Sequence, residues 1–410
     1  RYYDSLLTKV TARAPTPEMA IARMDRALRE FRIRGVSTNI AFVENLLKHP
    51  TFLNNEYHTK FIDQTPSLMD FKKRRDRATK ILTYIADITV NGHPETQGRA
   101  KPHAEAKLPR PPVKPQVAYP AGTRTLLDAK GPKAVVDWMK TQKQLLITDT
   151  TMRDGHQSLL ATRMRSIDMI NAAPAYAANM SDLFSVECWG GATFDVSYRF
   201  LQECPWQRLR DIRASMPNIM TQMLLRASNG VGYTNYPDNV VQFFVAQAAT
   251  SGVDVFRVFD SLNWVENMRV AMDAVVESGK ICEGTICYTG DMLDPARAKY
   301  DLKYYVSMAR DLEAAGAHVL GLKDMAGLLK PAAAQALVKA LKDELTIPVH
   351  FHTHDTSGIA GATILAAADA GVDAVDAAMD AFSGGTSQPC LGSIVESLRH
   401  TPRDTGLDIA

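Results

Sequence analysis

Cysteine is scarce and long apolar runs are missing, and both absences narrow the class of protein. The 410 residues include five cysteines, an odd number without any CxxC spacing, which is typical of reduced thiols in an intracellular protein. No apolar run reaches about 18 residues, and no signal peptide opens the chain. We therefore expect neither a membrane span nor secretion.

An excess of charge of one sign is also missing. Lys and Arg number 47 and Asp and Glu number 45, which leaves a net charge of +2. A balance this close argues against nucleic acid or an anionic membrane as the partner. The 46% of hydrophobic residues allows a large core, and the 22% of charged residues suits a surface in water.

The composition separates three regions, predicted as domains 1–70, 71–144 and 145–410. Residues 1–70 alternate strand-like segments with helices, a small α+β segment in which Thr16-Pro17-Glu18 is a good helix start. Because the chain begins with Arg1 rather than Met and is at once rich in apolar residues, we expect it to be a piece of a longer protein.

The middle region begins with a helix and continues into a linker. A basic-to-apolar segment predicts a helix over residues 71–91. Residues 92–121 contain seven prolines and few large apolar side chains. They are predicted to be an extended linker that cannot bury a core.

The third region repeats a strand, a turn and a helix eight times. Short apolar or β-branched runs begin near Leu145, Phe184, Thr221, Val253, Ile281, His318, Pro348 and Ala374. Helical stretches such as 239–250, 264–278, 304–315 and 331–344 lie between them. This rhythm predicts a closed (β/α)₈ TIM barrel. An open doubly wound sheet is the alternative, but eight near-even units without GxGxxG or GxxxxGKS disfavour it.

The strongest chemical signal lies in the seventh predicted strand. Residues two apart on a strand share a face, so His350, His352 and His354 all point the same way. The upper two can bind one metal ion together with Asp154 after the first strand, because active sites of such barrels lie at the C-terminal ends of the strands. His350 lies deepest and is expected to be structural. The alternative is a hydrogen-bonded histidine cluster without metal.

Lys323 lies near the inner end of the sixth strand. Burial there lowers the pKa of the lysine and frees a neutral amine. Such an amine can add CO₂ to give a carbamate, an anionic metal ligand. A plain ion pair with Asp324 or Asp355 is equally compatible with the spacing.

Two arginines and a glutamine form a candidate anion clamp on the same rim. Arg153, Gln157 and Arg226 follow the first and third strands, and a guanidinium presents a planar fork to the carboxylate of an α-keto acid. Taken singly, each arginine is explained at least as well by a salt bridge within the rim.

Several long segments carry a resemblance that covers essentially all of residues 145–398. They are Asp149–Ser158, ECWGGATFDV (187–196), LLRASNGVGYTNYPDNVV (224–241), RVFDSLNWVENM (257–268), KDMAGLLKP (323–331) and HFHTHDTSG (350–358). Together they resemble the carboxyltransferase domain of the pyruvate carboxylase family. Residues 2–52 resemble the C-terminal end of its biotin carboxylase domain, and 71–91 resemble part of its allosteric, connecting domain.

The resemblance implies roles for individual residues. Asp154, His352, His354 and a carboxylated Lys323 would bind Zn²⁺ or Mn²⁺. Arg153, Gln157 and Arg226 would hold pyruvate and its enolate, with Lys323 as a fourth catalytic residue. Asp195 and Tyr233 would lie where biotin docks. Arg32, Arg34 and Arg77 match allosteric positions around acetyl-CoA, although exposed helical arginines are by default merely solvated.

The implied reaction is transfer of CO₂ from carboxybiotin to pyruvate, giving oxaloacetate. The full-length family enzyme uses ATP, Mg²⁺ and bicarbonate, carries biotin on a domain not in this chain, and is expected to be a homotetramer activated by acetyl-CoA. It would be cytoplasmic in a bacterium and in the mitochondrial matrix in a eukaryote. The family's helical funnel, with its proton-shuttling Thr, would follow the barrel beyond Ala410, so we expect the chain alone to be incomplete for full turnover.

Three alternatives remain open from the sequence. One is an oxaloacetate decarboxylase or transcarboxylase subunit, which shares the barrel. Another is a Claisen enzyme like isopropylmalate synthase, which shares Arg-Asp-Gly-x-Gln and HxH but has no use for a carbamate at Lys323. The third is a non-enzymatic assembly or allosteric fragment.

Overall fold

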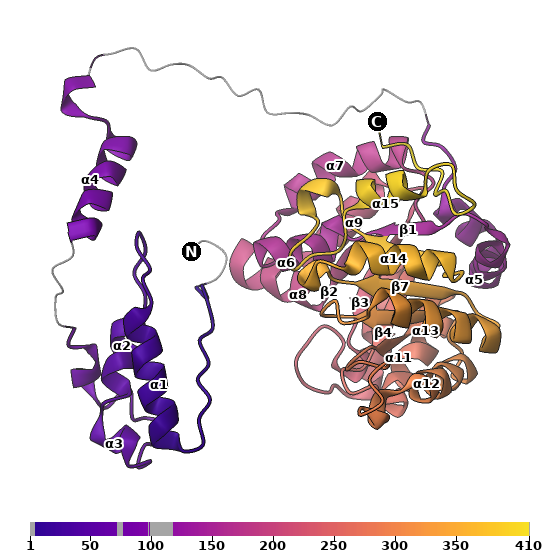
Figure 1. Ribbon diagram of the computed structural model, residues 1–410. Coiled ribbons are helices and arrows are strands. Elements are labelled where there is room, and N and C mark those ends of the chain that lie inside the picture. Colours follow the sequence, from indigo (N-terminus) through magenta and orange to yellow (C-terminus); the bar gives the residue numbers. More distant parts are fainter. Residues whose placement is uncertain (1–4, 72–76, 97, 99–117, 410) are drawn as a thin grey trace. The chain divides into compact units, whose positions relative to one another are not determined.

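The computed structural model describes residues 5–71, 77–96, 98 and 118–409 (Figure 1). The chain forms two compact units, Arg1–Leu108 and Pro109–Ala410. Most of the predicted proline-rich linker lies outside the described residues. Among the described residues, no helix combines the length and hydropathy needed to cross a membrane.

The described residues of the first unit form helices joined by irregular segments. Its helices are α1 (Pro17–Glu30), α2 (Ile40–Leu46), α3 (Pro50–Leu53) and α4 (Arg77–Asn91). Thr16 caps α1 as predicted, since its hydroxyl accepts from the Met19 N–H at 3.3 Å. The described part of this unit contains no β-strand.

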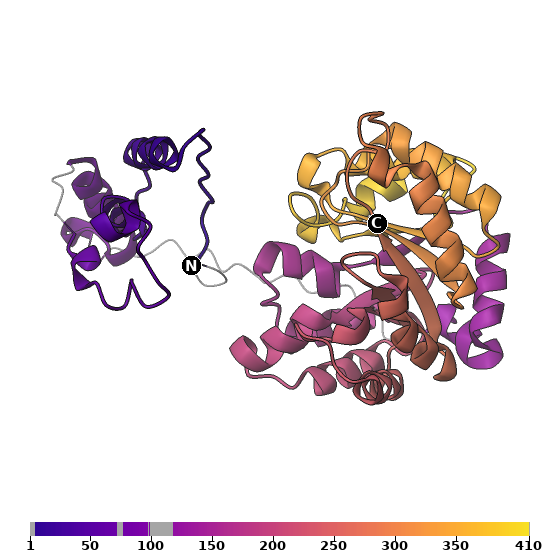
Figure 2. The same cartoon turned by 90° about the horizontal axis from the view of Figure 1, so that it is seen from below.

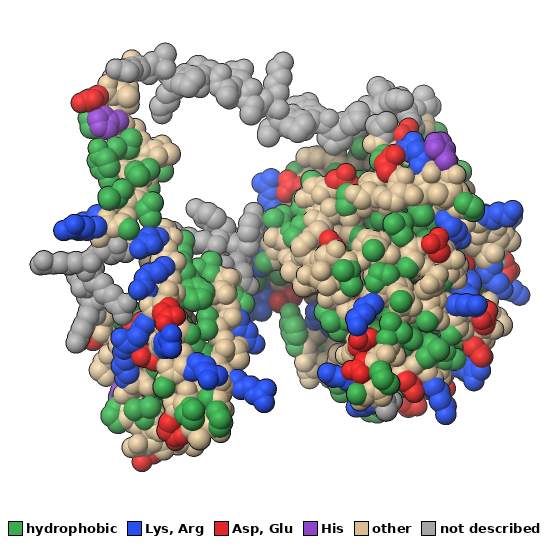
Figure 3. Space-filling view, viewed as in Figure 1, with side chains coloured by type: hydrophobic (Ala, Val, Ile, Leu, Met, Phe, Trp, Pro, Cys, Tyr) green, Lys and Arg blue, Asp and Glu red, His purple; other side chains and the backbone are tan. Residues whose placement is uncertain are grey.

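Helix α4 has no buried residue. Its large apolar side chains are exposed, Val90 at 81% (Figure 3). The helix predicted over 71–91 is present from Arg77 to Asn91, and residues 72–76 lie outside the described residues.

The second unit is the predicted barrel. Its eight strands are parallel and close on themselves, because β1 pairs with both β2 and β8. This closure excludes the open sheet. The strands are β1 (Leu146–Asp149), β2 (Ser185–Gly190), β3 (Met220–Leu225), β4 (Val255–Phe259), β5 (Ile281–Cys287), β6 (Val319–Asp324), β7 (Val349–Thr353) and β8 (Ala374–Ala377).

Helices surround the strands (Figure 2). They bury the outer faces of the strands, where residues such as Val258 of β4 and Phe351 of β7 are fully buried. The four helical stretches predicted from the sequence correspond to α10, α11, α12 and α13. The helices of this unit are α5 (Thr123–Thr141), α6 (His156–Leu160), α7 (Ser166–Asn179), α8 (Gly191–Val196), α9 (Pro205–Ser215), α10 (Asp238–Ser251), α11 (Val265–Glu277), α12 (Leu302–Ala314), α13 (Pro331–Glu344), α14 (Ala360–Asp369) and α15 (Leu391–Leu398).

The N-terminal end of the barrel is closed by α5. Leu127, Val135 and Met139 of this helix are buried in one cluster with the first apolar residues of the strands, such as Leu146 and Val255. The predicted connecting segment, residues 71–144, includes α5, which instead packs against the barrel. Because an apolar plug fills this end, polar chemistry is left to the opposite, C-terminal rim.

Candidate metal and substrate site

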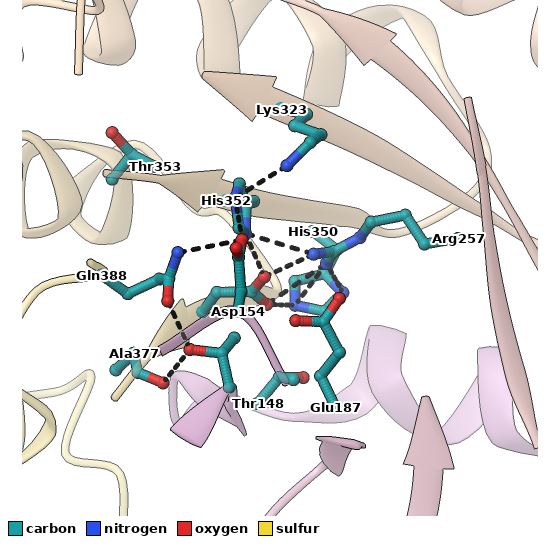
Figure 4. Close-up of polar contacts among 12 residues, drawn as sticks. Thr148, Asp154, Glu187, Arg257, Lys323, His350, His352, Thr353, Ala377 and Gln388 are labelled. Carbon is teal, nitrogen blue, oxygen red and sulfur yellow. Dashed lines mark hydrogen bonds and ion pairs between the residues drawn. The ribbon is translucent and has the colours of Figure 1, made fainter. Parts of the chain in front are cut away.

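Three potential metal ligands converge at the C-terminal rim. Asp154 comes from a π-helical turn after β1, His352 from β7, and His354 directly follows β7. Asp154 Oδ2 lies 3.3 Å from His352 Nε2 (Figure 4). The same oxygen lies 3.4 Å from His354 Nε2. The candidate ligand atoms all lie within 4.8 Å of one another, so one cation can reach all three.

The protonation of the two imidazoles suits a cation. His354 Nδ1 lies 2.7 Å from the carbonyl oxygen of Thr386, which can only accept, so Nδ1 carries the proton. His352 Nδ1 faces the Asp376 carboxylate at 2.5 Å and donates to it. The Nε2 atoms of His352 and His354 then each carry a lone pair, and these two atoms lie 3.1 Å apart. Two lone pairs and a carboxylate facing one another repel, and a divalent cation between them removes that repulsion.

The pKa of His354 favours the neutral, ligating form. Burial lowers this pKa to about 4, although Asp154 opposes the shift. The imidazole therefore keeps its Nε2 lone pair at neutral pH.

Lys323 reaches the same point from β6. Its side chain is 5% exposed, and Nζ lies 2.9 Å from His352 Nε2. Burial lowers the pKa of the amine, and Asp154 opposes the shift. A lowered pKa makes the neutral amine that carbamate formation requires easier to reach than in an exposed lysine.

The π-helical turn Thr151–Gly155 aims Arg153 into the barrel. Asp149 starts the turn by accepting from the Thr151 N–H at 3.1 Å, and π-turns of this kind recur at functional sites. The Arg153 guanidinium is 2% exposed. It lies 2.8 Å from Glu187, 3.1 Å from Gln157 and 3.3 Å from Asp154. The salt bridge that the sequence offered as the alternative is therefore present for Arg153, and its role in an anion clamp stays a prediction.

Arg226, Tyr233 and Asp195 form a second group. The Arg226 guanidinium lies 5.1 Å from the centre of the Tyr233 ring and donates to the Gly232 carbonyl at 3.1 Å. The Tyr233 hydroxyl lies 3.4 Å from Asp195 Oδ2. A Cβ atom at Gly191 would stand 2.8 Å from Arg226 Cζ, so a larger residue there would displace the end of the Arg226 side chain.

A cavity of about 310 Å³ adjoins this second group. It is lined by Arg226, Asn229, Gly232, Tyr233, Phe259, Asp260 and Ser261. Strand β2 connects the two groups. Glu187, within the strand, pairs with Arg153 of the first group. Gly191, just after the strand, lies against Arg226 of the second group.

A buried charge network below the metal group was not recognised in the sequence. Arg257 of β4 is fully buried and pairs with Glu283 and Asp376. His350 bridges the same two carboxylates at 2.8 and 2.7 Å. Burial alone would lower the pKa of His350, but Glu283 and Asp376 raise it to about 9. An arginine within an apolar strand was the available signal, because a buried charge requires partners.

The candidate allosteric arginines belong to the first unit. Arg32, Arg34 and Arg77 are exposed. Arg32 donates to the Phe31 carbonyl at 3.0 Å. Their allosteric role stays a prediction.

Two family models match the chain. The Biotin carboxylase C-terminal domain matches residues 1–64, and the HMGL-like family matches residues 246–410.

Curated relatives match the whole length. Pyruvate carboxylase of Bacillus subtilis is 55% identical over 410 residues, which is all of this chain and 36% of the relative. Human mitochondrial pyruvate carboxylase is 50% identical over 98% of this chain and 34% of its own length. The chain thus spans about a third of these relatives.

Solved structures agree in both sequence and fold. The complete multifunctional pyruvate carboxylase of Rhizobium etli is 63% identical, with a TM-score of 0.72, over 96% of this chain and 37% of that one. The carboxyl transferase domain of the same enzyme, with pyruvate, is 64% identical, with a TM-score of 0.73, over 82% of this chain and 57% of that one. Because identity this high extends over its entire length, the chain belongs to the pyruvate carboxylase family.

Proposed function

We propose that the barrel transfers CO₂ from carboxybiotin to pyruvate and thereby forms oxaloacetate. The observation that carries the proposal is the convergence of Asp154, Lys323, His352 and His354 on one point at the rim. The relatives support it, because the similar Rhizobium etli domain has been solved with pyruvate and with pyruvate and biocytin.

Asp154, His352 and His354 would hold Zn²⁺ or Mn²⁺. The two inward Nε2 lone pairs and one carboxylate suit either ion. Lys323 is proposed to add CO₂: its neutral amine forms an N–C bond, the displaced proton leaves to water, and the carbamate oxygen becomes a fourth ligand. When bound, the cation supplies positive potential beside the substrate.

Arg153, Gln157 and Arg226 are proposed to bind pyruvate. A guanidinium keeps its charge at any working pH and stabilises the substrate carboxylate and the enolate oxygen. Asp195 and Tyr233, near the 310 Å³ cavity, would receive the biotin ring.

The bond changes balance between the two substrates. The N1–C bond of carboxybiotin breaks and releases CO₂, and the biotin nitrogen takes the proton lost by the pyruvate methyl group. The electron pair left on that carbon forms the new C–C bond to CO₂. The proposed task of the protein is to hold both partners within reach and to keep water out.

The whole enzyme would do more than this barrel. We propose that residues 1–70 complete a biotin carboxylase domain that uses ATP, Mg²⁺ and bicarbonate, that residues 71–144 belong to the allosteric and connecting segment, and that 145–410 form the carboxyltransferase barrel. Acetyl-CoA would act near Arg32, Arg34 and Arg77, and the assembly would be a homotetramer. It would work in the bacterial cytoplasm or the mitochondrial matrix.

The experiment is biotin-dependent decarboxylation of oxaloacetate by the natural polypeptide that contains these residues. Lys323→Ala is expected to lower kcat by at least about 100-fold, the effect of removing one preorganised electrostatic group. Lys330→Ala is the matched control, since Lys330 makes an exposed pair with Asp291 and should leave kcat unchanged. Equal rates for Lys323→Ala and the unmodified protein would refute the carbamate. Absence of biotin-dependent activity in the unmodified protein would refute the function.

A further inference from the structure

The segment after β8 supports the metal group from a third direction. The Thr386 carbonyl accepts from His354 Nδ1 at 2.7 Å, and the Ser387 carbonyl accepts from the Asp355 N–H at 2.7 Å. The next residue, Gln388, is fully buried. This stretch therefore contacts the segment that carries His354, although it contains none of the expected ligands.

The Gln388 amide spans two elements of the site. Its Nε2 donates to Asp154 Oδ2 at 3.1 Å, and its Oε1 accepts from the Thr150 hydroxyl at 2.8 Å (Figure 4). A reversed amide would place its oxygen against a carboxylate oxygen and repel it. The nitrogen must therefore face Asp154.

The Thr150 hydroxyl supports this orientation, because its one proton can be donated to the amide oxygen of Gln388. Its hydroxyl has two acceptors in reach, Gln388 Oε1 at 2.8 Å and the Ala377 carbonyl at 3.1 Å. Only donation to Gln388 leaves the amide nitrogen free to meet Asp154. Donation from this hydroxyl thus favours the same orientation of the glutamine amide that Asp154 requires.

The two oxygens of Asp154 have different neighbours. Oδ1 lies 3.3 Å from Arg153, whereas Oδ2 faces both histidines and Gln388. Without a donor at Oδ2, the pull of Arg153 would be free to rotate the carboxylate. The amide also lies 3.5 Å from His354 Nε2, beside the lone pair that a cation would use.

We propose that Gln388, oriented by Thr150, is a positioning residue that holds Asp154 Oδ2 and the His354 ring in the arrangement that binds the cation. This inference rests on the proposed metal site and adds a residue outside the ligand set. Partners of this kind commonly change metal affinity by about 10- to 100-fold.

Gln222 provides a matched comparison. It is also a fully buried glutamine inside the barrel, and it accepts from the Ser185 hydroxyl at 3.1 Å. Its Nε2 has no hydrogen-bond partner among the described residues. Gln222→Met therefore removes the same chemical group from the same core without touching Asp154.

The test measures metal binding by the whole chain. Zn²⁺ affinity is obtained by competition with a chelator, and the absorption spectrum of bound Co²⁺ reports ligand geometry. Gln388→Met is expected to weaken Zn²⁺ binding by at least about tenfold and to shift the Co²⁺ bands. Gln222→Met is expected to leave both unchanged. Unchanged affinity and bands in a folded Gln388→Met protein would overturn the inference.

Thr150 supplies a second test if Gln388→Met does not fold. Thr150→Val keeps the shape but removes the proton that orients the amide, so binding should weaken, while Thr150→Ser should restore it. Equal affinity for the Val and Ser variants would overturn the inference. If the unmodified chain bound no Zn²⁺ or Co²⁺, the proposed metal site itself would fail, which separates the two outcomes.

Discussion

The polar residues inside the barrel differ from those at its outer rim in what holds them. Arg257, Glu283 and Asp376 are fully buried and satisfy one another. Tyr233 at the rim is 71% exposed, and its hydroxyl makes a contact of 3.4 Å. The fold brings these interior charges together, and the stability of the fold depends on their remaining paired. The exposed Tyr233 side chain remains available to a ligand, so its substitution should affect ligand binding without affecting stability.

The largest effect is expected when the interior network is broken. Arg257→Met removes the guanidinium that pairs with both Glu283 and Asp376, so these two buried carboxylates exceed the positive charge that His350 can supply. The free energy of unfolding should fall by about 3–5 kcal/mol, measured by urea denaturation. Arg310→Met is the control, because Arg310 forms an exposed pair with Glu344 and its loss should be at most about 1 kcal/mol. Similar losses for both variants would contradict the comparison.

A smaller, pH-dependent effect is expected at the other end of the barrel. His318 Nδ1 accepts from the Cys282 N–H at 3.0 Å just before β6, and burial lowers the pKa of His318. As pH falls below about 6.5, the unfolded chain takes up this proton first, so the folded state loses stability.

The His318 effect is measured as a difference between two unfolding curves. His318→Gln keeps a polar side chain but cannot titrate. The free energy of unfolding of the unmodified protein, minus that of the variant, should decrease between pH 7 and pH 5. A difference that stayed constant over this range would show that the histidine does not contribute to the pH dependence.

The smallest effect on stability is expected at the rim. Tyr233→Phe removes only an exposed hydroxyl, so the free energy of unfolding should change by less than about 0.5 kcal/mol. The KM for biotin in oxaloacetate decarboxylation should nevertheless rise, with a smaller change in kcat. Tyr236→Phe is the control on the same loop. A rise in KM as large for Tyr236→Phe would remove Tyr233 from the biotin pocket.

The sequence predicted the strands and helices better than the contacts between side chains that lie far apart along the chain. Strand β7 could be recognised because His350, His352 and His354 follow the period of a strand, and the polar run after β1 marked Asp154 as a rim residue. Both signals are local. The partners of Arg257 lie 26 residues away at Glu283 and 119 residues away at Asp376, and no local pattern relates such positions.

The same reason explains why Gln388 escaped notice. It lies 234 residues from Asp154 along the chain, in a segment that has no periodic pattern. The sequence also places helix α5 in the connecting segment, whereas in the structure its apolar residues cover the N-terminal ends of the strands.

By itself, the sequence determined the alternation of strands and helices, the rim that would carry the chemistry, and the residue types able to bind a cation and a keto acid. Only the tertiary structure decided which side chains are neutralised, which imidazole nitrogen is free, and which neighbours hold the ligands. Periodicity and side-chain chemistry are properties of short segments. Protonation and orientation depend on burial and on partners that closure of the barrel brings together.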